Sequence, residues 1–182
     1  PSARLELLVD VKLPEGSSLL ASDAAAKRLE PVLDKEEGLE NYATYVGTGA
    51  PRFVLPLDQQ LPQAGFAQFV LTTNDVEARE RIRAHLLAAL PNLLPEARTR
   101  VLCLENGPPV GWPVQLRVSG PDHAVLHEWA DKVASVLRTH HALTNVNLNW
   151  DEPSKVVRII IDQDRARATC TGTSVKRRTA PG

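Results

Sequence analysis

The order of hydrophobic patterns is the feature that most restricts how this chain can fold. Four short segments in which apolar residues alternate or cluster are typical of β-strands. They are 4–13 (RLELLVDVKL), 39–47 (LENYATYVG), 66–71 (FAQFVL) and 98–104 (RTRVLCL). Residues 18–36 have the composition and apolar face of a helix, and Asn74 opens a second helix that Pro91 and Pro95 are predicted to end. The predicted order is therefore strand, helix, strand, strand, helix, strand.

This order is that of the split βαβ, or ferredoxin-like, unit and predicts an α+β fold. The order starts again after the Pro- and Gly-rich linker ENGPPVGWP, with a strand, a helix and two strands predicted at 114–118, 122–140, 143–150 and 155–162. We therefore expect a complete ferredoxin-like βαββαβ subdomain followed by a truncated second βαββ unit, in a piece of a longer protein. The predicted boundaries are 1–108, 109–168 and a disordered tail at 169–182.

Charge and composition exclude several classes of function. The net charge is -1 and aromatic residues make up 4% of the chain, so neither a basic patch nor a stacking platform for nucleic acid is expected. The chain has no run of about 18 apolar residues that could cross a bilayer. Its N-terminal segment PSARLELLVD lacks the apolar core of a signal peptide.

Possible metal and catalytic groups are few. His123 and His127 lie four residues apart on a predicted helix, but two histidines are one ligand short of a zinc site, so solvated helix residues are the preferred interpretation. Asp162 and Asp164 form a D-x-D pair, for which helix capping is the preferred interpretation. Cys103 lies in an apolar strand without a base nearby in sequence. We predict no catalytic residue, no metal and no cofactor.

The stretch from Gly47 to Gly65 is unusually long for a connection between two strands. Hairpin loops have about 2–5 residues, so a loop of this length suggests a function. Its start, GTGAPR, is similar to a phosphate-binding loop but is followed by neither Gly-Lys-Ser/Thr nor a helix N-terminus. Nucleotide binding is therefore not the preferred interpretation.

Several ordered segments together resemble the periplasmic porter region of resistance-nodulation-division (RND) efflux transporters. They are LLVDVKLPEGSSLLASD, VGTGAPRFVLPLDQQLPQAGFAQFVL, LENGPPVGWPVQLRVSGPD and VRIIIDQDRARA, and the resemblance covers roughly residues 4–168. The match is to the second large periplasmic loop of the AcrB-like hydrophobe/amphiphile efflux family. The tail CTGTSVKRRTAPG departs from the family, so no function is placed on it.

The resemblance implies a periplasmic part of an inner-membrane, proton-driven multidrug transporter. The partners would be the transmembrane domain, the other protomers of a trimer, a periplasmic adaptor protein and an outer-membrane channel. Small amphiphilic substrates would pass through a cleft between the two units, and the chain itself would not be an enzyme. A stand-alone ferredoxin-like ligand-binding or regulatory module is the alternative.

The resemblance also implies candidate site residues. The loop between the second and third strands corresponds to the family's switch loop, with Gly47, Gly49, Pro51 and Gly65 giving it hinges and stiffness. The substrate-contact candidates are Arg52, Phe53, Leu102, Leu104, Glu105, Asn147 and Asn149. An alternative for Phe53 is that it packs the loop down together with Leu55.

Overall fold

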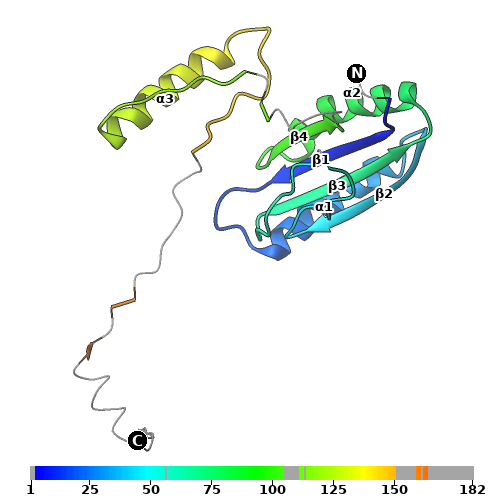
Figure 1. Ribbon diagram of the computed structural model, residues 1–182, viewed down its shortest axis with the longest axis horizontal. Coiled ribbons are helices and arrows are strands. Elements are labelled where there is room, and N and C mark those ends of the chain that lie inside the picture. The colour runs from blue at the N-terminus through cyan, green and yellow to red at the C-terminus, as the bar shows by residue number, and fades with distance from the viewer. Residues whose placement is uncertain are drawn as a thin grey trace, which may run out of the picture.

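A four-stranded antiparallel sheet organises the N-terminal part of the protein (Figure 1). The computed structural model describes residues 3–55, 57–104, 111–112, 114–150, 159–160 and 162–163. The elements, in chain order, are β1 (Glu6–Lys12), α1 (Leu19–Leu33), β2 (Leu39–Val46), β3 (Phe66–Thr73), α2 (Val76–Leu93), β4 (Arg98–Cys103) and α3 (His123–Arg138). The strand order β2-β3-β1-β4 confirms the predicted ferredoxin-like subdomain.

The two faces of the sheet differ because successive side chains of a strand point to opposite sides. In β1, Leu7, Val9 and Val11 lie in the main core with α1 and α2. Leu8 and Asp10 therefore point to the other face, which neither helix covers. Asp10 is opposite Gln68 of β3 and Arg100 of β4 in the strand register. One face of the sheet is therefore covered by α1 and α2, and the other face, which carries Leu8 and Asp10, is not.

Local signals explain where the helices begin. Ser18 caps α1 by accepting a hydrogen bond from the Ala21 amide at 3.2 Å. Asp75 caps α2 by accepting from the Ala78 amide at 2.7 Å, one residue later than predicted. The prediction that Pro91 ends α2 is wrong, because the helix continues to Leu93. Pro91 lies in the last turn, and the buried side chains of Leu90 and Leu94 on either side hold that turn on the core.

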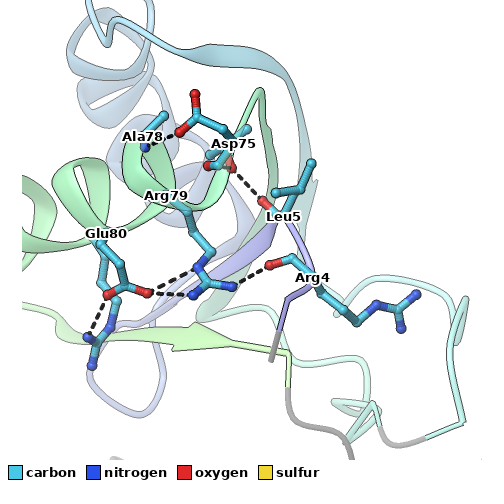
Figure 2. A network of polar contacts seen from close by, with 8 residues as sticks. Arg4, Leu5, Asp75, Ala78, Arg79 and Glu80 are labelled. Atoms are coloured by element: carbon cyan, nitrogen blue, oxygen red, sulfur yellow. Dashed lines mark hydrogen bonds and ion pairs between the residues drawn. The ribbon is translucent and has the colours of Figure 1, made fainter. Parts of the chain in front are cut away.

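A buried arginine joins the start of α2 to the start of the sheet (Figure 2). Arg79 is 2% exposed, and its guanidinium donates hydrogen bonds to the backbone carbonyl of Arg4 and to the Glu80 carboxylate, the latter at 2.7 and 3.1 Å. Thr73 adds a second link, since its hydroxyl donates to the Leu5 carbonyl at 2.8 Å. These contacts fix the chain where it enters β1.

The second predicted unit has only its helix among the described residues. The strands predicted at 114–118 and 143–150 are wrong, since neither segment has regular strand structure. A strand needs a neighbour for its backbone hydrogen bonds, and the predicted partner at 155–162 lies mostly outside the described residues. Several apolar side chains of this unit are correspondingly exposed, among them Val114, Leu116, Val125, Trp129 and Val136.

The segment after α3 returns to the edge of the sheet. Asn145 donates its side-chain amide to the Thr99 carbonyl at 3.1 Å, and Arg98 donates to the Leu148 carbonyl at 3.3 Å. Both bonds reach the beginning of β4. The segment after α3 therefore contacts the first unit through polar groups at the beginning of the edge strand β4.

Candidate functional site

The loop from Gly47 to Gly65 is closed at its base. The Gly47 amide donates to the Phe66 carbonyl at 2.7 Å, and the Gln63 amide donates to the Gly47 carbonyl at 3.0 Å. The two ends of the loop are thus held together like the neck of an Ω-loop, a form that is frequently functional. The long connection is therefore a closed loop whose two ends are joined by backbone hydrogen bonds.

This loop packs on the face of the sheet that the helices leave open (Figure 1). Leu57 is 3% exposed and forms a small apolar cluster with Leu8 and Leu104. Val54 and Leu102 are partly buried at the edge of the same cluster. At about 1.5–3 kcal/mol for a fully buried Leu, Leu57 is a substantial anchor for the loop.

A chain of polar contacts lies beside this apolar anchor. The Ala50 amide donates to the side-chain oxygen of Gln68 at 2.7 Å, and Gln68 donates through its side-chain nitrogen to an Asp10 carboxylate oxygen at 2.7 Å. Ala50 and Gln68 are 1% and 3% exposed. Gln68 therefore bridges the loop backbone to a carboxylate of the central strand, with both the oxygen and the nitrogen of its side chain used.

Burial raises the pKa of Asp10 above the ordinary value of 3.8. The hydrogen bond from Gln68 and the positive charge of Arg100 lower it in part, and the negative charge of Asp58 on the loop raises it further. The cause that dominates is desolvation, which disfavours the charged form of a carboxyl group. The site therefore holds a partly desolvated carboxylate under the loop, between a cation of β4 and an anion of the loop.

We predict that Asp10→Asn removes a pH-dependent loss of stability. Because the pKa of Asp10 is higher in the folded state, its contribution is full below about pH 3.8 and is lost as the pH rises through the folded-state pKa. The Asn side chain keeps the acceptor oxygen for Gln68 but carries no charge. The free energy of unfolding of Asp10→Asn, measured by urea unfolding, is therefore expected to rise relative to that of wild type as the pH increases above about 4.

The matched control for this prediction is Asp131→Asn, the same substitution at an exposed position of α3. The free energy of unfolding of this variant is expected to change with pH in the same way as that of wild type. A parallel curve for Asp10→Asn as well would contradict the proposed environment of this carboxyl group.

Arg52 and Phe53 lie on the exposed side of the loop. Phe53 is 48% exposed and Leu55 is 88% exposed, so these two side chains do not pack the loop down. That role belongs to Leu57, which the sequence prediction did not single out. The exposed aromatic ring next to a cation remains available for contact with a ligand.

The other substrate-contact candidates lie in two places. Leu102 and Leu104 meet the loop through Leu57, and Glu105 lies outside the described residues. Asn147 donates to the Asn145 carbonyl at 2.9 Å, within the segment that touches the beginning of β4, and Asn149 is exposed. The structure thus brings the leucines together with the loop and leaves the asparagines near the opposite end of β4.

The candidate hinge residues differ in their backbone roles. Gly47 has a φ of 76°, a conformation that favours glycine, whereas Gly49 and Gly65 have no positive φ. A Cβ at Gly49 would lie 2.8 Å from the Cβ of Gln60, so this glycine permits the two arms of the loop to approach. Pro51 is exposed. Only one of the three glycines therefore supplies the expected conformational freedom.

The histidines of α3 surround a tryptophan. The ring of His127 lies 4.1 Å from that of Trp150, and His123 approaches the same ring edge-on at 5.7 Å. Among the residues that the structure describes, no group of three or more His, Cys, Asp or Glu side chains could hold a metal ion. Within the same residues, no helix combines the length and the apolar character needed to cross a bilayer.

Sequence reasoning missed the polar chain because its members are unremarkable by type. Asp10 carried one signal, since it interrupts the apolar run LLVDV at a position that alternation places away from the core. Gln68 and Arg100 gave no such signal. Their partnership with Asp10 comes from strand register, which pairs residues far apart in the chain.

The comparisons with known proteins concern the fold. No family model matches the sequence, and the comparison with curated proteins gave no significant match.

One similar solved structure is a dimeric ferredoxin-like protein of unknown function from Jannaschia sp. CCS1, with 21% identity, a TM-score of 0.34, and coverage of 55% of this chain and 98% of that one. Two others are structures of SnoaB from Streptomyces nogalater, described as a cofactor-independent oxygenase. One of them, a mutant form, has 7% identity and a TM-score of 0.37 and covers 58% of this chain and 97% of that one; the other structure has 9% identity and a TM-score of 0.32 and covers 56% and 93%.

The prediction that this chain is not an enzyme is contradicted by the two SnoaB structures, because a described oxygenase is among the proteins similar to it. We withdraw that prediction. At this level of identity the likeness assigns no reaction to the chain. The element order and the sheet topology establish an α+β protein with a ferredoxin-like fold.

Proposed function

We propose that this chain is part of the periplasmic porter region of an RND-type efflux transporter. In this role it forms part of the pathway for small amphiphilic substrates. A transmembrane domain supplies the energy of proton flow, and the partners are the other protomers of a trimer, a periplasmic adaptor and an outer-membrane channel. The loop from Gly47 to Gly65 acts as the switch loop beside the substrate.

The observation that carries the proposal is the form of this loop. A chain segment that resembles the family's switch loop is closed at its neck, anchored by Leu57, and exposes Arg52 and Phe53. A loop held on a rigid sheet is where ligand contact is expected. Support also comes from the four ordered segments that resemble the family, since their order and spacing are more specific than any single motif.

An open pocket lies on the C-terminal arm of the loop. It has a volume of about 430 Å³ and is lined by residues 58–63 together with Phe66. The lining is mostly polar, with Asp58 and three glutamine side chains beside Leu61, Pro62 and Phe66. This polar pocket lies on the same loop as Arg52 and Phe53.

The first experiment reads the native open reading frame on both sides of this segment. The proposal expects flanking helices of about 20 apolar residues on each side. A frame that holds this unit without such helices contradicts the transporter and favours the stand-alone ligand-binding module.

The second experiment measures efflux by the full-length protein. Phe53→Ala is expected to reduce the efflux of an amphiphilic dye about fivefold or more, because loss of an aromatic contact costs about 1 kcal/mol or more of binding free energy. Leu55→Ala is the matched control on the same loop, since Leu55 is even more exposed. Equal efflux by the two variants would show that Phe53 does not contact the substrate.

A further inference from the structure

The series of hydrogen bonds from Ala50 through Gln68 to Asp10 lies next to a further charged residue, Arg100. Arg100 lies opposite Asp10 in the strand register, and its positive charge acts on the Asp10 carboxylate. The same guanidinium donates a hydrogen bond to the Gly111 carbonyl and lies 4.4 Å from the ring centre of Trp112. Residues 111–112 belong to the connection between the two predicted units. Arg100 therefore stands between Asp10 and that connection.

We propose that Gln68 and Asp10 form a latch that holds the loop on the sheet, and that Arg100 couples this latch to the connection at Gly111 and Trp112. In the closed state the Ala50 amide, the Gln68 side chain and the Asp10 carboxylate are joined in series. Release of the connection frees Arg100 to interact more strongly with Asp10, which weakens the acceptor that orients Gln68. The loop and the connection then change together.

The geometry favours a latch over a purely structural contact for two reasons. Ala50 and Gln68 are almost fully buried, so breaking their bond leaves a desolvated amide without a partner. The polar contact also depends on one side chain, because Gln68 alone joins the Ala50 amide to Asp10. Its loss is therefore expected to open the Ala50 side of the loop while Leu57 still holds the other side.

The functional meaning of the latch rests on the proposed function, because a latched loop would gate access to the substrate. The latch itself concerns only this chain. We therefore test it by hydrogen exchange, which needs no transport. A failed latch test leaves the reading-frame and efflux experiments unaffected, and failure of those experiments leaves the exchange result standing.

The first test compares amide exchange at Ala50 in wild type and Gln68→Ala. The expected result is an increase of up to about tenfold in the exchange rate, the factor that corresponds to one lost hydrogen bond. Exchange at Leu7 and Val9 in the central strand reports whether the sheet is intact. Gln59→Ala, the same substitution at an exposed position of the loop, is the control and is expected to leave Ala50 unchanged. Unchanged exchange at Ala50 in Gln68→Ala, with the sheet intact, would overturn the latch.

The second test measures the coupling with a double-mutant cycle. Arg100→Gln is expected to change the exchange of Ala50 by about threefold or more in wild type, and to have little effect in the Asp10→Asn background, where no carboxylate charge remains. Arg98→Gln removes the same charge two residues away on the same face of β4 and serves as the control. Equal effects of Arg100→Gln in both backgrounds would show that Arg100 does not act through Asp10.

Discussion

Replacing Arg79 with Ala is expected to lower the free energy of unfolding by about 2–4 kcal/mol. The substitution leaves the Arg4 carbonyl without its side-chain donor and removes a long side chain that is 2% exposed. A lost hydrogen bond from a charged donor costs about 1.5–3 kcal/mol, and the space left by the buried side chain adds to that. Urea unfolding followed by circular dichroism measures the loss.

Arg83→Ala is the matched control for this prediction. Arg83 contacts the same Glu80 carboxylate at 3.3 Å, but its side chain is 42% exposed, so its removal is expected to cost less than about 1 kcal/mol. A second measurement separates the two arginines further. The hydrogen bond from Arg79 holds the pKa of Glu80 below its ordinary value, with a smaller effect from Arg83. An NMR titration is expected to show a larger rise of that pKa in Arg79→Ala. Equal effects of the two variants on stability would contradict the role of the buried guanidinium.

Replacing Gly38 with Ala is expected to lower the free energy of unfolding by about 2–4 kcal/mol. Gly38 has a φ of 90°, and a Cβ built there would lie 2.6 Å from the Cβ of Ala78. Ala78 cannot move aside easily, because its amide is bound to the Asp75 cap and its side chain is 1% exposed. Backbone strain of about 1 kcal/mol therefore adds to overpacking of about 1–3 kcal/mol.

Gly16→Ala separates these two contributions. Gly16 has a similar φ of 85°, but no atom lies within 4 Å of the position that a Cβ would occupy. Its substitution is expected to cost about 1 kcal/mol, the strain alone. The difference between the two variants in urea unfolding measures the contact with α2. If both variants lose the same stability, the close approach of Gly38 to Ala78 does not exist in solution.

Local patterns were sufficient to predict the elements of the first unit, because each of its strands has a neighbouring strand in the sheet and both helices pack in the same core. The pattern of residues 4–13 predicted a strand, and in β1 Leu7, Val9 and Val11 lie together in the main core. The order of strands and helices then allowed the ferredoxin-like unit to be predicted without knowledge of any contact. The end of α2 was predicted wrongly because tertiary packing outweighed the usual effect of Pro91.

The second unit shows what local patterns leave open. The segment at 143–150 has an apolar alternation like that of a strand, yet the structure describes no strand there. Alternation gives a segment one apolar face, but a strand also needs a neighbour that accepts and donates its backbone hydrogen bonds. Its described contacts include instead Asn145 with Thr99 and Trp150 with the histidines of α3.

The sequence by itself determined the order of the elements in the first unit and the position of the long loop between β2 and β3. Those properties depend on residues close together in the chain. Only the tertiary structure decided that Leu57 anchors the loop, that Gln68 joins it to Asp10, and that Arg79 is buried at the entry to β1. These contacts join residues that strand register and helix packing bring together over tens of positions, and residue type alone does not reveal such partners.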